Sequence, residues 1–286
     1  MRNQVLCLGV NNSFGTDTIK QIKMFRAAGF EGFFTGWSQG DNIKNIKKHA
    51  DEIGMFYQSI HAPFDHAADL WKDGEDSQKA TDELIACLRD CSENDIGIMV
   101  VHAFAGFDEH SPTPEGIESF SRVVCEAEKL GVIIALENTE GEEYLAALME
   151  VFKSSKAVGF CFDTGHELCY NEGRDMMELY GDRLVSTYFN DNLGISNLYG
   201  KITWADDLHL LPFDGIVDFE GIAERLIKYN YRGPLTFNLK RSSKPKRHDN
   251  DKYMRMTTEE YIAEAYARAC RFAVMKDRLA AKNNIL

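Results

Sequence analysis

Seven side chains that could bind a metal or transfer a proton lie at, or just after, the C-terminal ends of short apolar segments. They are His61, His102, Glu137, Asp163, His166, Asp207 and His209. In a barrel of parallel strands the C-terminal strand ends meet at one mouth, so residues far apart in the sequence can share one cluster. Imidazole and carboxylate groups are common ligands of divalent metal ions. Their placement therefore predicts a metal site at the mouth of such a barrel.

Two of the acids end strongly apolar runs. Glu137 follows residues 132–136, and Asp163 follows residues 158–162. A carboxylate buried on a strand is costly unless it has a partner, and these two fall on neighbouring strands. A metal ion is the simplest common partner for them.

The alternation of short apolar runs with longer amphipathic stretches predicts repeated βα units and a parallel sheet. The expected strands are 5–9, 32–35, 56–60, 98–102, 132–137, 158–163, 184–189 and 235–239. The expected helices are 16–28, 41–53, 77–94, 114–130, 142–152, 219–229 and 258–275. We therefore expect an α/β fold made of a single (β/α)8 TIM barrel, with residues 1–286 forming one domain.

Residues at the expected helix ends support this order of elements. Left-handed helix caps favour glycine, and the expected helices are followed by Gly29, Gly54, Gly131 and Gly233. Thr257 precedes Glu260 by three residues, which predicts a capping box at the start of the last helix.

A basic run, 240–247, follows the last expected strand and should leave the same mouth as the cluster. Such a run is either a solvated loop or a clamp over an anionic group of a substrate. The second interpretation makes Lys240 a candidate for substrate binding.

The overall composition narrows the classes of partner. The chain has 286 residues with a net charge of −13, which disfavours nonspecific nucleic-acid binding. No apolar run approaches the roughly 20 residues that a membrane span needs, so we expect no membrane partner. The seven cysteines are scattered without a CxxC pair, which predicts reduced thiols and a cytoplasmic location.

Several motifs carry a resemblance to a known superfamily. They are SIHAPF at 59–64, ALEN at 135–138, FDTGH at 162–166, NDN at 190–192 and DLHLLPFDG at 207–215. Together they resemble the xylose isomerase-like TIM barrels, which include sugar isomerases and epimerases and also endonuclease IV. The resemblance covers the third to the eighth expected strand.

This resemblance implies one divalent ion held by a Glu after strand five, an Asp after strand six, a His after strand seven and a Glu after strand eight. The first two correspond to Glu137 and Asp163, whereas the other two positions hold Tyr188 and Asn238. Asn238 cannot exchange a proton with a substrate but could bind the ion through its amide oxygen. Tyr188 could act as an acid or, if strongly perturbed, as a phenolate ligand.

The endonuclease IV relatives bind three zinc ions. By that resemblance one site would hold His61, His102 and Glu137, and another would hold His166, Asp207 and His209. The site that joins them needs the positions of Tyr188 and Asn238, so half of it is missing.

Three hypotheses follow. The first is a metal-dependent sugar isomerase or epimerase, with Glu137 as ligand and base, Asp163 as ligand, and His209 or Asn238 completing a site for zinc, manganese or magnesium. His61, His102 and His166 would then bind substrate hydroxyls or supply a proton, and an apolar wall would come from Trp37, Phe64 and Phe104. The second is a zinc phosphoesterase with two separate ions. The third is a noncatalytic barrel that binds a sugar or a partner, and homo-oligomer formation is open in all three.

Overall fold

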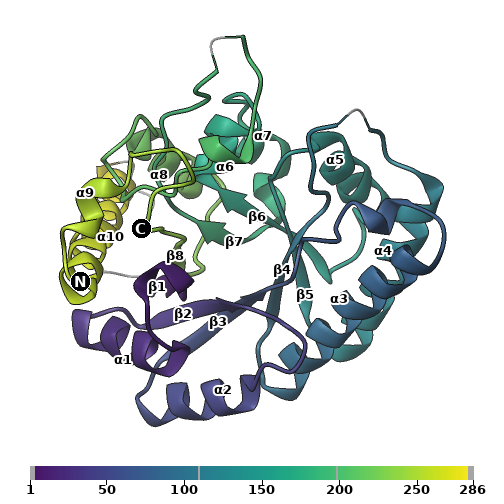
Figure 1. Ribbon diagram of the computed structural model, residues 1–286, viewed down its shortest axis with the longest axis horizontal. Coiled ribbons are helices and arrows are strands. Elements are labelled where there is room, and N and C mark those ends of the chain that lie inside the picture. Colours follow the sequence, from purple (N-terminus) through teal and green to yellow (C-terminus); the bar gives the residue numbers. More distant parts are fainter. Residues whose placement is uncertain (1–3, 109, 198, 283–286) are drawn as a thin grey trace.

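The computed structural model of the protein describes residues 4–108, 110–197 and 199–282. Its strands form one parallel sheet, in which each strand from β1 to β6 pairs with the next along the chain and β1 also pairs with β8. The strands are β1 (Leu6–Gly9), β2 (Gly32–Gly36), β3 (Phe56–His61), β4 (Ile98–His102), β5 (Ile133–Glu137), β6 (Val158–Asp163), β7 (Leu184–Tyr188) and β8 (Leu235–Phe237). Figure 1 shows the strands enclosed by the helices.

Backbone hydrogen bonds just beyond the end of β7 close the sheet into a barrel. Phe189 N–H donates to the Thr236 carbonyl oxygen (2.8 Å), and Asn238 N–H donates to the Phe189 carbonyl oxygen (3.2 Å). These bonds join the two edges of the sheet. The expected (β/α)8 TIM barrel is confirmed.

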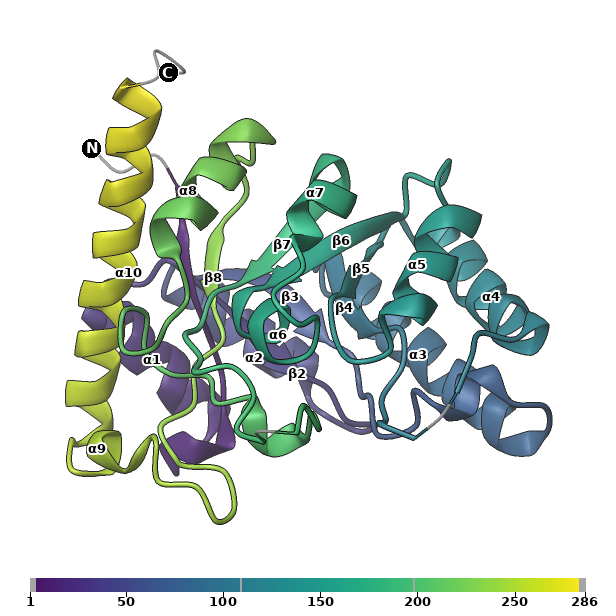
Figure 2. The same cartoon turned by 90° about the horizontal axis from the view of Figure 1, so that it is seen from above.

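Helices follow the strands and cover the outside of the barrel. They are α1 (Thr18–Ala28), α2 (Ile43–Glu52), α3 (Glu75–Glu93), α4 (Pro114–Leu130), α5 (Glu142–Val151), α6 (Thr164–Cys169), α7 (Met176–Tyr180), α8 (Phe219–Lys228), α9 (Asp251–Met254) and α10 (Thr258–Lys282). In Figure 2 the long helix α10 runs along the barrel beside α1 and α8. Among the described residues, no helix combines the length and the apolar composition needed to cross a membrane.

The helix ends agree with most of the expected caps. Gly29, Gly54 and Gly131 have positive φ angles of 114°, 66° and 70°. The capping box of α10 is present, because Thr257 N–H donates to Glu260 Oε2 (2.7 Å) and Glu260 N–H donates to Thr257 Oγ1 (3.1 Å).

The sequence-based expectations were wrong at several places, and the short helix α9 was also not expected. Gly233 is not the left-handed residue after α8, because Asn230 takes that conformation instead (φ 51°). Two short helices, α6 and α7, lie between β6 and β7 where none was expected. Helix α10 continues to Lys282 rather than ending near residue 275. Helices of five or six residues are too short to show a clear apolar period, which explains the second error.

A small apolar cluster fills the interior of the barrel. It consists of Phe34, Val100, Ala135, Cys161 and Tyr188, one from each of β2, β4, β5, β6 and β7. Each of these residues is almost fully buried. The cluster forms a floor below the C-terminal strand ends.

Candidate metal centre

Strand geometry brings the acids and histidines together above this floor. Side chains two positions apart on a strand point to the same face. His102 therefore follows Val100 into the barrel, Glu137 follows Ala135, and Asp163 follows Cys161. The apolar residue of each pair seals the interior, and the polar residue faces the mouth.

Glu137 lies at the centre of the cluster and is 1% exposed. Its Oε2 atom lies 3.2 Å from His61 Nε2 and 3.4 Å from His102 Nε2. Its Oε1 atom lies 3.1 Å from His166 Nδ1. Within the described part of the chain neither carboxylate oxygen has a hydrogen bond of good geometry. A buried carboxylate of this kind requires a cation or a proton beside it.

Two histidines are oriented by backbone carbonyl groups. His61 Nδ1 lies 2.7 Å from the Ala62 carbonyl oxygen, and His209 Nδ1 lies 2.9 Å from the Asn238 carbonyl oxygen. When Nδ1–H donates to such a carbonyl, Nε2 of the neutral ring carries a lone pair toward the site, as in metal-bound histidines. These lone pairs face the carboxylates of Glu137 and Asp207, which repel them unless a proton or a cation lies between. The residues therefore fit a bound divalent metal.

Asp163 is held by the protein itself. Asn190 Nδ2 donates to both carboxylate oxygens (3.0 and 2.9 Å), and His166 N–H donates to Oδ1 (2.8 Å). The last bond makes Asp163 the N-cap of α6, the helix that carries His166. Burial raises the pKa of the Asp163 carboxyl group above its ordinary value, and Glu137 adds to this effect while His166 opposes it.

The FDTGH motif is explained by this arrangement. Thr164 Oγ1 donates to the Asn190 carbonyl oxygen (2.7 Å) and accepts from Asn190 N–H (3.0 Å). A Cβ atom at Gly165 would collide with Asn190 Oδ1. The threonine and the glycine therefore fix the asparagine that holds Asp163.

Asp207 is the third acid of the mouth and has different neighbours. Its Oδ2 atom lies 2.8 Å from His209 Nε2 and 3.0 Å from Lys244 Nζ, and its Oδ1 atom lies 3.5 Å from His166 Nε2. Burial alone would raise the pKa of this carboxyl group, but His209 and His166 hold it well below its ordinary value.

The buried ring groups differ in their protonation. Burial lowers the pKa of His102 and of His209, which favours neutral rings at these positions. Burial also opposes charge on His166, but Asp163, Asp207 and Glu137 together raise the pKa of His166 well above its ordinary value. His166 therefore lies between Glu137 and Asp207, and these acids favour its protonated ring when no metal is bound.

The structure describes three groups whose ligand atoms lie within 4.8 Å of one another. The groups are His61, His102 and Glu137; Glu137, Asp163 and His166; and His166, Asp207 and His209. All seven residues at the expected strand ends therefore meet in one mouth. Glu137 and His166 each belong to two of the groups.

The two positions that depart from the superfamily pattern differ in their setting. The Tyr188 ring is fully buried and stacks on Phe34, with ring centroids 4.4 Å apart. Burial raises the pKa of Tyr188 well above its ordinary value and so favours the protonated phenol. This shift argues against Tyr188 as a phenolate ligand. Asn238 contributes its backbone, with its carbonyl oxygen facing His209 Nδ1.

The expected apolar wall is only partly assembled. Phe64 lies at the mouth and stacks on His102, with ring centroids 4.5 Å apart. Trp37 instead donates to Asp90 Oδ2 of α3 through its indole N–H (2.6 Å). Phe104 stacks on Tyr144 of α5 at 4.2 Å. Trp37 and Phe104 therefore pack toward helices outside the cluster.

Some residues of the site were missed in the sequence. Asn190 and Lys244 contact the acids directly, and Tyr170 packs against the His166 ring at 4.8 Å. Asn190 lies in a motif that the sequence does contain, NDN, and Lys244 lies in the basic run. Tyr170 follows α6, a helix that was not expected, and it gave no signal.

Residues 22–265, most of the chain, match the family described as xylose isomerase-like TIM barrel. The protein belongs to this family. It is also 33% identical over 163 residues to the uncharacterised protein y4fM of Sinorhizobium fredii, a match that covers 55% of this chain and 46% of that protein. The match therefore spans about half the length of that relative.

Solved structures show the same fold at low sequence identity. A xylose isomerase domain protein from Planctomyces limnophilus is 16% identical with a TM-score of 0.72, and the match covers 98% of this chain and 99% of the other. The IolI protein with a bound zinc atom is 13% identical with a TM-score of 0.72, over 94% of this chain and 98% of the other. D-psicose 3-epimerase with D-tagatose, from Clostridium cellulolyticum H10, is 16% identical with a TM-score of 0.66, over 93% of this chain and 98% of the other.

Proposed function

We propose that this protein is a metal-dependent isomerase or epimerase that acts on a small carbohydrate next to a carbonyl group. One observation carries the proposal: Glu137 is buried at the mouth, faces three imidazoles and has no hydrogen bond of good geometry among the described residues. The epimerase and the zinc-bound protein of the same fold support this choice of chemistry.

The two oxygens of Glu137 have separate roles in this proposal. Oε1 shares one metal-binding group with Asp163 and His166, and these three residues would hold a zinc, manganese or magnesium ion. When bound, a divalent ion polarises a substrate carbonyl and makes the neighbouring C–H more acidic. Asn238 remains a candidate further ligand through its amide oxygen.

Oε2 of Glu137 faces His61 and His102 and is the site of proton transfer. A proton taken from the substrate by Glu137 is passed to these imidazoles, and burial favours the neutral His102 ring that can accept it. His209, paired with Asp207, is the second group able to exchange a proton, in place of the glutamate that position 238 lacks. The protonated Tyr188 phenol can act as a hydrogen-bond donor but not as a base.

A second candidate is a zinc phosphoesterase with two ions. The group of His166, Asp207 and His209 favours it, because it is separate from the group of His61, His102 and Glu137. Lys244 opposes it, because its ammonium group already lies 3.0 Å from Asp207 Oδ2, and a metal ion there would have to displace it. We therefore favour one ion.

Elemental analysis of protein purified without chelator tests the proposal. We expect about one equivalent of metal in the wild type, lost in Glu137→Gln and in Asp163→Asn. Glu220→Gln, the same change on an exposed residue of α8, serves as the matched control and should keep the metal. No metal under any loading condition would contradict both enzyme hypotheses.

Proton exchange tests the reaction itself. Ketoses and aldoses are incubated in D2O with the metal-loaded protein, and deuterium next to the carbonyl is followed by NMR. We expect exchange with the wild type and none with Glu137→Gln, since this variant lacks both the proposed base and the metal that makes the C–H more acidic. Two or more metal equivalents with hydrolysis of a phosphodiester, and no exchange, would instead support the phosphoesterase.

A further inference from the structure

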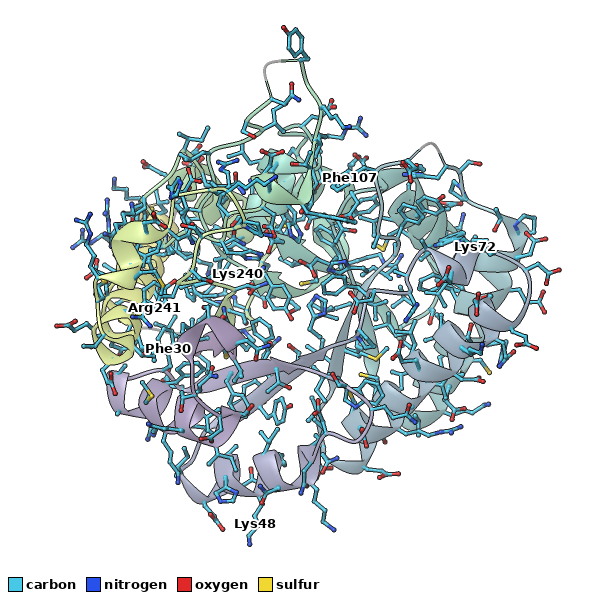
Figure 3. The ribbon with its side chains drawn as sticks, in the orientation of Figure 1. Phe30, Lys48, Lys72, Phe107, Lys240 and Arg241 are labelled. Carbon is cyan, nitrogen blue, oxygen red and sulfur yellow. The ribbon has the colours of Figure 1, made fainter. Side chains whose placement is uncertain are left out.

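The loop after β8 turns two lysines toward the site, whereas its arginines are used elsewhere. In Figure 2 this yellow-green loop lies on the same side of the barrel as α9, with the other loops that follow the strands. Lys244 Nζ lies 3.0 Å from Asp207 Oδ2 at the mouth. Lys240 N–H donates to the His209 carbonyl oxygen (3.0 Å), which places Lys240 beside the same histidine. Figure 3 shows Lys240 over the middle of the barrel, in contrast to Lys48 and Lys72 at its periphery.

The arginines and polar residues of this loop fix its shape. Arg241 donates to the Met256 carbonyl oxygen and to Thr258 Oγ1 at the start of α10. Arg247 donates to Asp249 Oδ2 (2.8 Å) and approaches Asp206 Oδ1 (3.4 Å). Asn250 Nδ2 donates to the carbonyl oxygens of Leu208 (3.1 Å) and Lys240 (2.8 Å). These hydrogen bonds hold the loop on both sides of the two lysines, and the loop therefore fixes where the lysines lie.

The charges at this corner of the mouth do not balance. Asp207 is the carboxylate beside Lys244, and it is shared with His209 and His166. Among the described residues, no carboxylate forms an ion pair with Lys240, which is half-buried. Burial lowers the pKa of Lys240; Asp207 opposes this shift and Lys244 adds to it. Two ammonium groups therefore lie near one carboxylate that already has two imidazole neighbours.

We propose that Lys240 and Lys244 form a subsite for the anionic group, a carboxylate or a phosphate, of a small polyhydroxy substrate. The subsite lies beside His209, so the anion would anchor one end of the substrate while its carbonyl end reaches Glu137. Two ammonium donors on a fixed loop suit an anion of either kind, as point charges rather than as a planar fork. This inference rests on the proposed function, which accounts for the carbonyl end of the substrate. The substrate class that it names is a sugar acid or a sugar phosphate rather than a neutral sugar.

Calorimetric titration of the full chain with matched ligand pairs tests the subsite. D-fructose 6-phosphate is compared with D-fructose, D-gluconate is compared with D-glucitol, and inorganic phosphate is titrated alone. We expect at least one anionic ligand to bind about tenfold or more tightly than its neutral partner. Its chemistry, phosphate or carboxylate, then identifies the anion that the subsite takes.

Variants of the loop separate the lysines from general charge. Lys240→Met and Lys244→Met should each weaken the anionic ligand about tenfold or more and leave the neutral ligand unchanged. Lys240→Arg, which keeps the charge, should retain most of the preference. Lys246→Met is the matched control, because Lys246 is exposed on the same loop, and it should change neither affinity. Circular dichroism checks that each variant is folded.

Metal content measured on the same samples separates this inference from the proposed function. Equal binding of anionic and neutral ligands by a protein that holds metal at Glu137 would overturn the subsite and leave the proposed function standing. Anion binding that depends on both lysines, in a protein that loads no metal, would support the subsite and overturn the proposed function. An anion preference that survives Lys240→Met and Lys244→Met would also overturn the subsite.

Discussion

Glu137 and Asp207, two of the three carboxylates of the mouth, are both buried but have different cations within reach. Glu137 faces three imidazoles, and the described residues place no lysine or arginine in an ion pair with it. Asp207 faces two imidazoles and the ammonium group of Lys244. Both acids share His166, but only Asp207 has a lysine beside it.

This difference shows how one fold can direct a metal to one of two similar sites. At Asp207 the negative charge already has a permanent positive partner. At Glu137 the negative charge faces only imidazole rings, which carry no permanent positive charge. Glu137 therefore needs a cation from solution to balance its buried charge. The comparison therefore predicts one ion, on the Glu137 side.

The largest expected effect separates two histidines that both contact Asp207. His166→Ala removes a proposed ligand, and we expect the affinity for zinc to fall about a hundredfold or more, which corresponds to roughly 3 kcal/mol. His209→Ala should keep the metal and the exchange through Glu137 but lose epimerisation of the substrate. Competition with a zinc-binding dye measures the affinities. Equal loss of metal in both variants would remove the distinction between the two acids.

Removing the lysine should make Asp207 more like Glu137. Lys244→Met leaves Asp207 buried without its ammonium partner, so we expect a loss of about 1–3 kcal/mol in the free energy of unfolding of the metal-free protein. With excess zinc, the same variant should bind a second ion at His166, Asp207 and His209. Mass spectrometry under native conditions counts the ions, and Lys246→Met is the control. A count that stays at one would show that Lys244 is not what keeps the second site empty.

A smaller effect concerns the segment that carries Asp207 and His209. Asp214 ties this segment to α9 and α10, since its carboxylate accepts from Tyr253 Oη (2.7 Å) and lies near Arg268 Nη1 (3.1 Å) and Lys252 Nζ (3.0 Å). Burial alone would raise the pKa of Asp214, but these partners lower it below its ordinary value.

Because the folded pKa is depressed, the stabilisation by Asp214 is complete above the unfolded pKa of about 4 and is lost as the pH falls through the lower folded value. Asp214→Asn should therefore cost about 1 kcal/mol near pH 7. The difference in Tm between the two proteins should shrink below about pH 4. A constant difference from pH 7 to pH 2 would contradict this origin.

The smallest effect is expected at Trp37, on the outer side of the mouth. Trp37→Phe removes the hydrogen bond to Asp90, so we expect a loss of about 1 kcal/mol of stability and unchanged sugar affinity. Phe64→Ala, which removes the ring stacked on His102, should instead weaken sugar binding. Urea denaturation and calorimetry measure the two quantities. Weaker sugar binding in Trp37→Phe would contradict this prediction and show that Trp37 contributes to the binding site.

The sequence predicted the barrel and the meeting of its acids and histidines because both follow from the periods of strands and helices. A residue that ends a strand of the barrel, such as Glu137 or Asp163, lies at the mouth whatever its neighbours are. The position of Trp37 could not be predicted in this way, because it depends on a single contact with Asp90 of α3. The partner of Lys244 depends on the folded shape of a loop, which no period describes. The short helix α6 is held by Asp163 and Asn190 rather than by an apolar face, so it too left no pattern.

The contact between His209 and position 238 has a consequence for the evolution of this barrel. Asn238 orients the imidazole through its main-chain oxygen, and every amino acid supplies that atom. The side chain at 238 can therefore be exchanged by mutation while the ring of His209 stays in place. Substitutions at such a position can change the chemistry of the mouth during evolution while the surrounding structure is kept.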